Sequence, residues 1–297
     1  MQISAAMVKD LRERTGAGMM DCKKALEEAG GDREKAVEIM RLSGQAKADR
    51  KADRVAAEGV IAIRVDEDAG RAVMVEVNCE TDFVAKEQAF RDFADAVCLR
   101  IFEESPQDVE ALGNLSSEKG GDGPAIDEVR RELIARIGEN IGIRRFEIVD
   151  SKGGRLSSYL HGVRIGVIVD VDGGDSACAR DIAMHVAASR PIAIDEKGIP
   201  ADLLEGERRI IEAQIEDSGK PAEIRQKMLE GRMRKYLQEV TLLGQPFVKD
   251  SDQSIERYLK DAGASVIRFE RFEVGEGIEK KSDNFAEEVM SQVRSNS

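Results

Sequence analysis

The sequence has no tryptophan, and only 4% of its residues are aromatic. Its cores must therefore rest on smaller aliphatic side chains, which are plentiful because 41% of the 297 residues are hydrophobic. A chain this long can bury more than one small core, so we expect several modest domains. No stretch approaches the roughly 18 to 20 apolar residues that a membrane-spanning helix needs. The first residues also lack a basic segment followed by an apolar run. We therefore expect a cytoplasmic protein.

Positive charge is also in short supply, because 58 acidic residues outnumber 45 basic ones and give a net charge of −13. Nucleic-acid binding gains affinity when Lys and Arg replace condensed counterions, so we expect no direct contact with nucleic acid. Binding to anionic membranes is disfavoured for the same reason. One basic patch consists of Lys47, Arg50, Lys51 and Arg54. Acidic residues interrupt it, which favours a solvated linker helix over an RNA contact.

The signatures of cofactor binding and catalysis are missing. There is no GxxxxGK[ST] phosphate loop. Gly16 and Gly18 form half of a dinucleotide fingerprint, but they separate two expected helices, which is typical of a helix end. With only His161 and His185 and no HExxH motif, neither a zinc site nor a Ser-His-Asp triad has support. We expect no enzyme activity, cofactor or metal, and we interpret His185 as a core histidine on an apolar helix face.

Cysteines are few, and none of them forms a CxxC pair. They are Cys22, Cys79, Cys98 and Cys178. We expect reduced, buried thiols in a cytosolic protein. A thiol-dependent enzyme that uses Cys22 or Cys79 is a minor alternative, because no histidine lies within either motif to act as a base.

Three short helices are predicted at the amino terminus. Ser4 is a candidate N-cap for the first helix, which should end at Thr15–Gly16. The second helix should run from Met19 to Ala29, and Asp32 should cap a third that stops at Ser43–Gly44. Residues 1–46 then form a small bundle, and residues 47–56 form a linker. Such a unit buries little, so we expect a marginal module whose exposed residues serve a partner.

The apolar period then changes from helical to two. VIAIRV at 60–65 and VMVEV at 73–77 predict an antiparallel pair that turns at 68–70. A helix carrying Phe90, Phe93, Ala94, Val97 and Ile101 should cover one face of this sheet. The polar stretch from Ser105 to Gly123 predicts a mobile loop before a helix at 126–137. Residues 57–152 are therefore expected to form a first core subdomain.

A similar order recurs downstream, where a strand at 164–171 precedes a helix that holds Ile182 and His185. This recurrence predicts a second, similar subdomain from residues 153–199 and 238–279. Between its two parts, residues 200–237 are expected to form an antiparallel helical hairpin with two apolar stripes. The stripes are Leu204, Ile211 and Ile215 on the first helix, and Ile224, Met228 and Leu237 on the second. The hairpin either protrudes and pairs with a second subunit or packs on its own core.

Six segments, in order, resemble the elongation factor Ts family. The first is LRERTGAGMMDCKKAL at 11–26, the second EVNCETDFVAK at 76–86, and the third RIGENI at 136–141. The others are IAMHVAASRP at 182–191, LGQPFV at 243–248 and RFEVGEGIE at 271–279. The resemblance covers nearly the whole chain, so six ordered matches leave little room for coincidence.

The resemblance implies a fold and an activity. The fold is α+β: an N-terminal three-helix bundle like a ubiquitin-associated domain, two similar core subdomains with small antiparallel sheets, a protruding helical hairpin and a C-terminal helix. The hairpin at 200–237 is expected to mediate self-association, and residues 280–297, with Phe285 and Val289, are expected to form a C-terminal module. The activity is guanine-nucleotide exchange on elongation factor Tu, so the GDP, GTP and Mg²⁺ involved are held by the partner.

The same resemblance assigns candidate residues for binding elongation factor Tu. Asp82 and Phe83, within Thr81, Asp82, Phe83 and Val84, are expected beside its Mg²⁺ and phosphate region. From the residues alone, core packing by Phe83 would be favoured instead. Arg12, Met19 and Met20 match positions that touch a helix of the G domain, although both methionines could belong to the bundle core. Further matches to family contact regions are Ile137, Gly138, His161 and Gly162, of which the last two are expected against a distal domain.

An adaptor or holdase-like scaffold is the alternative. It would recognise some other partner through the N-terminal module and would not need Asp82 or Phe83.

Overall fold

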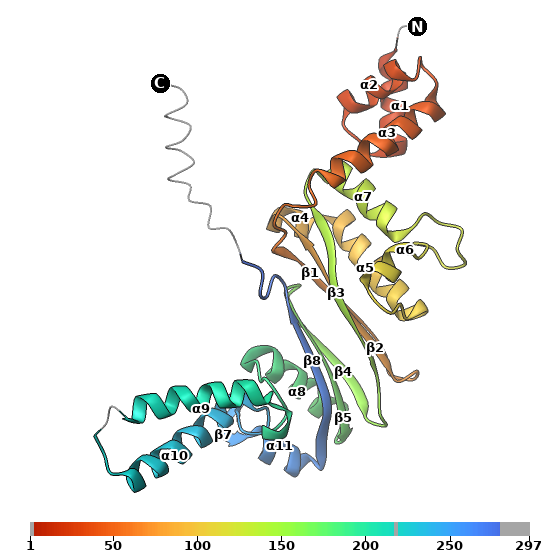
Figure 1. Ribbon diagram of the computed structural model, residues 1–297. Coiled ribbons are helices and arrows are strands. Elements are labelled where there is room, and N and C mark those ends of the chain that lie inside the picture. The colour runs from red at the N-terminus through yellow and green to blue at the C-terminus, as the bar shows by residue number, and fades with distance from the viewer. Residues whose placement is uncertain (1–2, 217–218, 280–297) are drawn as a thin grey trace, which may run out of the picture.

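A computed structural model describes residues 3–216 and 219–279 of the protein. Helices and small antiparallel sheets are mixed along this part of the chain, which confirms the predicted α+β class. Three helices lie at one end, two three-stranded sheets lie in the middle, and a helical hairpin lies at the other end (Figure 1). The predicted C-terminal helix with Phe285 and Val289 lies outside the described residues.

The N-terminal module contains three helices around a small core. They are α1 (Ala5–Thr15), α2 (Met19–Glu28) and α3 (Arg33–Asp49). Both predicted N-caps are confirmed: the Ser4 side chain accepts the Met7 N–H, and Asp32 accepts two N–H groups at the start of α3. Leu11, Cys22 and Leu26 are buried between the helices. The bundle therefore follows the helical spacing of the sequence.

The predicted end of the third helix at Ser43–Gly44 is wrong, because α3 continues to Asp49. A Cβ atom on Gly44 would lie 3.2 Å from the Cβ of Ala135 on α7 (Ile126–Ile137). Glycine at this position lets two helices approach closely instead of ending one of them. The packing of α3 on α7 offsets the roughly 1 kcal/mol that a glycine costs inside a helix. Arg41 adds an ion pair with Glu128 of α7 at 2.5 Å.

The predicted linker is helical only at its start. After Asp49 the chain makes turns, and the carbonyls of Ala52 and Arg54 accept hydrogen bonds from the Asn140 side chain. The Lys51 ammonium donates to the Gly138 carbonyl. The linker is thus attached to the end of α7 and is not a solvated helix throughout.

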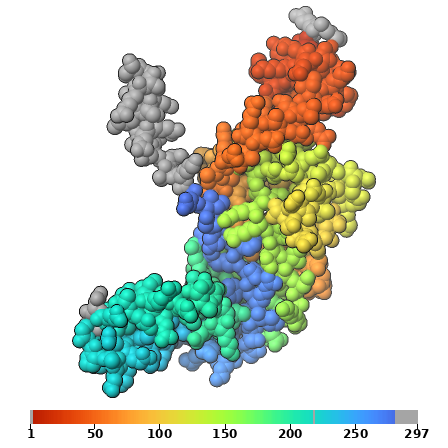
Figure 2. Space-filling model, viewed as in Figure 1, coloured from red at the N-terminus to blue at the C-terminus, as the bar shows by residue number. Residues whose placement is uncertain are grey.

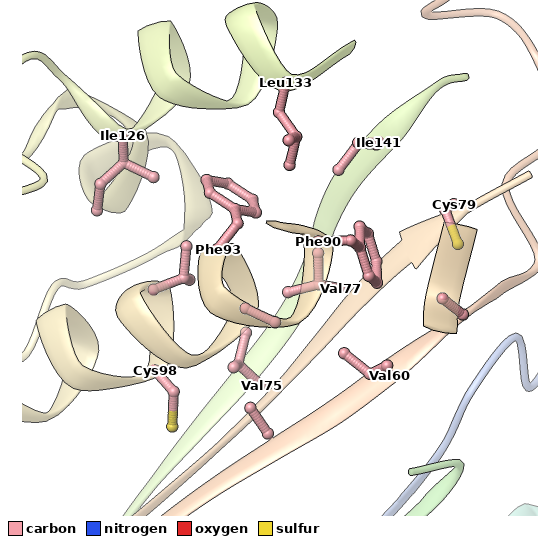
Figure 3. Close-up of a cluster of buried hydrophobic side chains, with 14 of the residues drawn as sticks. Val60, Val75, Val77, Cys79, Phe90, Phe93, Cys98, Ile126, Leu133 and Ile141 are labelled. Atoms are coloured by element: carbon pink, nitrogen blue, oxygen red, sulfur yellow. The ribbon is translucent and has the colours of Figure 1, made fainter. Parts of the chain in front are cut away.

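The first sheet has the strand order β1-β2-β3. Its strands are β1 (Glu58–Asp66), β2 (Arg71–Cys79) and β3 (Ile141–Asp150). Helices α4 (Asp82–Lys86), α5 (Gln88–Glu104) and α7 cover one face. Figure 3 shows Phe90 of α5 beside Val77 of β2, while Phe93 points towards Ile126 and Leu133 of α7. The alternating apolar pattern therefore directs Val75 and Val77 to the helices, as predicted.

The stretch from Ser105 to Gly123 differs from the predicted mobile loop, because it contains the helix α6 (Val109–Asn114). Asp108 caps this helix, and Leu112 is fully buried in the core beneath it. Ser116 forms a β-bridge with Ala125. The buried Leu112 and the Asp108 cap thus hold a helix in a segment whose glycine and serine content is typical of loops.

The second sheet repeats the topology of the first, with the order β4-β5-β8. Its strands are β4 (Arg155–His161), β5 (Ile165–Gly173) and β8 (Ala264–Glu273). The helix α8 (Ser176–Ser189) follows the central strand, as α4 and α5 follow β2. The smaller elements here are the 3-10 helix at Glu196–Gly198, β6 (Pro246–Phe247), β7 (Asp250–Ser254) and α11 (Ile255–Ala262). The recurring sequence order thus corresponds to two similarly built sheets.

The two sheets pack on each other through the faces that the helices leave open. Ile61, Met74 and Ile168 are buried in this shared core. A Cβ on Gly166 would lie only 2.5 Å from Ile61, so glycine permits the close approach. The buried Glu76 carboxylate accepts hydrogen bonds from β2, from β3 and from the backbone that follows β8. Its donors are Arg144, Arg145, Asn78 and the Gly275 N–H.

The hairpin consists of α9 (Ala201–Glu216) and α10 (Ala222–Val240), and it projects away from the sheets (Figure 1). Ile211, Ile215 and Leu229 form its small core. The two helices contact mainly each other, so packing on the core of the rest of the chain does not describe most of the hairpin. Ile224, which was predicted to lie on a stripe, is exposed together with Leu203 and Ile210.

Candidate functional site

Asp82 and Phe83 lie at the exposed start of the short helix α4. Thr81 has extended backbone angles, and its hydroxyl accepts the Val84 N–H, so it is the N-cap of this helix. The segment is thus the first turn of a helix. Val84 is buried in the core, so the expectation that its side chain meets a partner needs correction. Its burial instead fixes the direction in which the two residues before it point.

Phe83 is the most exposed large apolar side chain in the described part of the protein, at 76%. The alternative that it packs in the core is therefore excluded. Its nearest described ring contact is the Lys86 ammonium, 5.8 Å from the ring centroid. Burying such a side chain is worth about 1.5 to 3 kcal/mol, and the free protein does not obtain this stabilisation.

Asp82 is also exposed, and it accepts a hydrogen bond from Lys86 at 2.6 Å. This hydrogen bond lowers the pKa of the Asp82 carboxyl below its ordinary value, and the charge of Arg164 acts in the same direction. The carboxylate is therefore ionised at neutral pH. The site presents a negative charge directly beside an exposed ring.

The turn between β4 and β5 carries His161 and Gly162, which are both exposed. Gly162 has φ of 61°, a backbone conformation that favours glycine. The effect of Arg164 on Asp82 and the packing of Val163 against the core of the first sheet place this turn near α4. The structure therefore brings His161 and Gly162 to the same region as Asp82.

Ile137 and Gly138 lie at the C-terminal end of α7. Gly138 has φ of 94° and ends the helix, while its carbonyl accepts from Lys51. Ile137 is half-buried and packs against the first core. These two residues thus support the surface near α4 more than they project from it.

The N-terminal module exposes Arg12, Met19 and Met20. Met19 is 53% exposed and Met20 is 64% exposed, which excludes the alternative that the two methionines form the bundle core. A Cβ on Gly16, in the Thr-Gly-Ala-Gly segment before them, would lie 2.9 Å from Arg136 of α7. That glycine permits the module to sit against the core. Figure 2 shows this module projecting from the opposite end of the molecule to the hairpin.

Two hollows of the described surface lie elsewhere. One, of about 470 Å³, lies between the N-terminal module and α7, and another, of about 440 Å³, lies between α5 and α7. Neither is lined by Asp82 or Phe83. The site is a projecting surface, which suits contact with a macromolecule better than capture of a small molecule.

The family model described as Elongation factor TS matches residues 80–276, about two thirds of the chain. The elongation factor Ts of Methylococcus capsulatus is 59% identical over 294 residues, which cover 99% of each chain. The elongation factor Ts proteins of Thioalkalivibrio sulfidiphilus and Alkalilimnicola ehrlichii are 56% and 55% identical, again over 99% of each chain. The chain belongs to the elongation factor Ts family.

Membership of the elongation factor Ts family gives the protein a role as a translation elongation factor. The matched region contains α4, the end of α7 and the turn between β4 and β5. The N-terminal module lies before it, but the full-length relatives cover that module as well. The family assignment therefore extends to every candidate residue named above.

The sequence did not reveal the residues that hold α4 and the linker in place. Glu139 accepts from Thr81 at the start of α4, Glu80 accepts from the Asn140 N–H, and the Asn140 side chain donates to the linker. Glu139 and Asn140 lie within the RIGENI segment at 136–141, whose resemblance to the family assigns no role to either residue. Two adjacent polar side chains directly after a helix-ending glycine were the available signal.

The cysteine thiols and possible metal ligands of this member of the elongation factor Ts family show no sign of a reactive site among the described residues. Burial raises the pKa of the Cys79 and Cys98 thiols to about 12, so neither supplies a thiolate at neutral pH. The described residues contain no cluster of His, Cys, Asp or Glu arranged to hold a metal ion. Among those same residues, no helix has the length and apolar character needed to cross a membrane.

Proposed function

We propose that this protein is a guanine-nucleotide exchange factor that binds elongation factor Tu in the cytoplasm. The observation that carries this proposal is the exposure of Phe83 beside the ionised Asp82 at the start of a capped helix. A large apolar side chain is costly to leave in water but contributes strongly when it fills a pocket of a partner. The elongation factor Ts family is the setting in which such a pair would meet elongation factor Tu.

In the proposed mechanism, Asp82 and Phe83 enter the Mg²⁺ and phosphate region of elongation factor Tu. The ring displaces elements that hold the ion, and the carboxylate adds negative charge where the nucleotide phosphates already lie. Because Mg²⁺ bridges the phosphates to the partner protein, its loss weakens the hold on GDP. This chain forms no covalent bond and needs no cofactor or metal of its own.

Exchange then follows from coupled binding. The exchange factor and GDP each lower the affinity of elongation factor Tu for the other by the same factor. A ternary complex therefore forms transiently, GDP leaves, and GTP binds in its place.

Further contacts would hold the two proteins together. Arg12, Met19 and Met20 would contact a helix of the G domain, where flexible methionines adapt to an apolar surface. His161 and Gly162 would contact a distal domain, while Ile137 and Gly138 would support the central contact. The exposure of the first five residues is what supports these assignments.

Release of a fluorescent GDP from elongation factor Tu tests the proposal. The protein should accelerate release, and the double variant Asp82→Ala with Phe83→Ala should lower the rate by about tenfold or more. The control Val248→Ala with Asp252→Ala also removes one exposed apolar side chain and one exposed carboxylate, and should keep full activity. Unchanged release with the unsubstituted protein would reject the proposal and favour the adaptor alternative.

We also propose that the hairpin pairs with the hairpin of a second copy. Its exposed apolar residues are Leu203, Ile210 and Ile224. α9 carries five acidic and two basic side chains, whereas α10 carries five basic and three acidic ones. In a two-fold arrangement α9 of one copy can face α10 of the other, which brings opposite charges together.

A further inference from the structure

Thr81, the residue that caps α4, is held by both oxygens of one carboxylate. Its backbone N–H donates to Glu139 Oε2 at 2.9 Å, and its hydroxyl donates to Glu139 Oε1 at 2.6 Å. The same hydroxyl accepts the Val84 N–H at 3.4 Å. Because a hydroxyl has one proton, donation to Glu139 leaves its lone pairs free for Val84. Glu139 therefore sets the orientation in which Thr81 caps the helix.

Glu139 is itself fixed by the residues on either side of it. Gly138 ends α7, and its carbonyl accepts from Lys51. On the other side, the backbone N–H of Asn140 donates to Glu80 Oε1 at 2.6 Å. The carboxylate is thus presented from a short, fixed connection between α7 and β3.

The same connection holds the linker of the N-terminal module. The Asn140 side-chain amide donates to the carbonyls of Ala52 at 3.2 Å and Arg54 at 2.8 Å. Asn140 is buried, so these bonds are partly shielded from water. The N-terminal module and α4 are therefore attached to one point of the core.

Little else directs the exposed end of α4. The helix has five residues, which is far too short to be stable by itself. Among the described residues, the side-chain hydrogen bond of Asp82 goes to Lys86 in the same helix and not to the core. The buried Val84 and Ala85 fix the far side of the turn. The near side, which carries Asp82 and Phe83, depends on Thr81 and hence on Glu139.

We propose that Glu139 is a positioning residue for nucleotide exchange. Its carboxylate holds Thr81 so that Asp82 and Phe83 keep one orientation before the partner arrives. Without it, the pair would sample many orientations, and few of them would enter the nucleotide site of the partner. The N-terminal module would still bind. This inference rests on the proposed exchange function.

The test measures GDP release from elongation factor Tu at increasing concentrations of the full-length protein. Glu139→Gln keeps the size of the side chain but turns one acceptor into a donor that faces the donors of Thr81. We expect the maximal release rate to fall about tenfold, in line with the loss of a charge-assisted hydrogen bond. The half-saturating concentration should stay within about twofold, because the binding surfaces remain.

Thr81→Val and the double variant provide a cycle. If Glu139 acts through the Thr81 hydroxyl, the double variant should be no slower than the slower of the two single variants. Thr81→Ser keeps the hydroxyl and should retain most of the maximal rate. A thermal melt checks that Glu139→Gln is folded. If it is not, Thr81→Val tests the same hydrogen bond from its other partner.

Glu147→Gln is the matched control, because it removes one charge and one ion pair, with Arg268, at a distance from α4. It should leave both kinetic parameters unchanged. Loss of activity in Asp82→Ala with Phe83→Ala, together with an unchanged maximal rate in Glu139→Gln, would overturn this inference but not the proposed function. The inference would also be overturned if the losses of maximal rate in Thr81→Val and Glu139→Gln multiplied in the double variant. A change in the half-saturating concentration alone would overturn it as well.

Discussion

His185 lies in surroundings that keep its imidazole neutral. Its Nδ1 accepts the Val248 N–H at 3.2 Å, so Nε2 carries the proton and donates to Gln245 Oε1 at 3.0 Å. Gln245 in turn donates to the carbonyls of Ser189 and Glu239 at the ends of α8 and α10. Burial lowers the pKa of His185 below its ordinary value of 6.5. The residue thus has the structural role that its apolar helix face predicted.

The lowered pKa of His185 predicts a loss of stability in mild acid. Below about pH 6.5 His185 is protonated in the unfolded chain but stays neutral in the folded protein. Acid therefore favours unfolding. The free energy of unfolding should fall by up to about 1.4 kcal/mol per pH unit as the pH drops from 6.5, until the folded pKa is reached. Urea unfolding at several pH values measures this slope.

The control for that experiment is His185→Gln, which cannot titrate. Its stability should be lower at neutral pH but flat between pH 6.5 and 5.5. His161, the other histidine, is present in both proteins. An equal slope in both proteins would show that His185 does not cause it.

At the scale of elements, the contact between α3 and α7 fixes the N-terminal module. Gly44 meets Ala135, Gly16 lies beside Arg136, and Arg41 pairs with Glu128. Two glycines thus make room for the module against α7, which begins 77 positions after the end of α3. A longer side chain at either glycine would push the module away from the core without entering the core itself.

Gly44→Leu should therefore loosen the module. Leucine favours helix more than glycine does by about 1 kcal/mol, so α3 should stay helical. Its side chain cannot fit where a Cβ already lies 3.2 Å from Ala135. We expect faster amide hydrogen exchange and faster proteolysis in the linker at 50–56, with unchanged exchange in β2 and α5.

Gly231→Leu on α10 is the matched control, because no atom lies within 4 Å of a Cβ placed there. It should leave the linker protected. Equal protection of the linker in Gly44→Leu would mean that the α3 and α7 contact does not hold the module.

At the scale of the whole molecule, the parts that could reach partners lie at its ends and side. The N-terminal module and the hairpin project from opposite ends, and α4 lies on the core near the linker (Figure 1). The central sheets bury their apolar faces against each other and against α5, α7 and α8. The hairpin does not obtain such cover from the rest of the described chain, since Leu203 and Ile210 stay exposed on α9.

Sedimentation equilibrium tests the proposed pairing of hairpins. The unsubstituted protein should form a dimer as its concentration rises, and Leu203→Glu with Ile210→Glu should keep it monomeric. Two like charges opposed across an apolar contact cost several kcal/mol. The thermal midpoint of the monomer should barely change, because both side chains are exposed.

Leu42→Glu with Val55→Glu adds the same charge at two other exposed apolar positions and should leave the dimer intact. A protein that stays monomeric at every concentration, or a dimer that survives the hairpin substitutions, would contradict the pairing.

The sequence by itself determined the local elements. The caps at Ser4 and Asp32, the alternating strands and the two hairpin helices follow from side-chain chemistry and period over a few neighbouring residues. The six ordered motifs likewise identified the family. These local predictions hold in the folded protein because each depends on residues that are close together in the chain.

Only the tertiary structure decided which of these residues are accessible. It left Phe83 and Met20 exposed, buried Val84, and carried α3 through Gly44. The bond between Thr81 and Glu139 joins residues 58 positions apart, and no local pattern specifies such a pairing. Burial and hydrogen bonding depend on which distant segments meet in space, and the free energy of those contacts outweighs local preference.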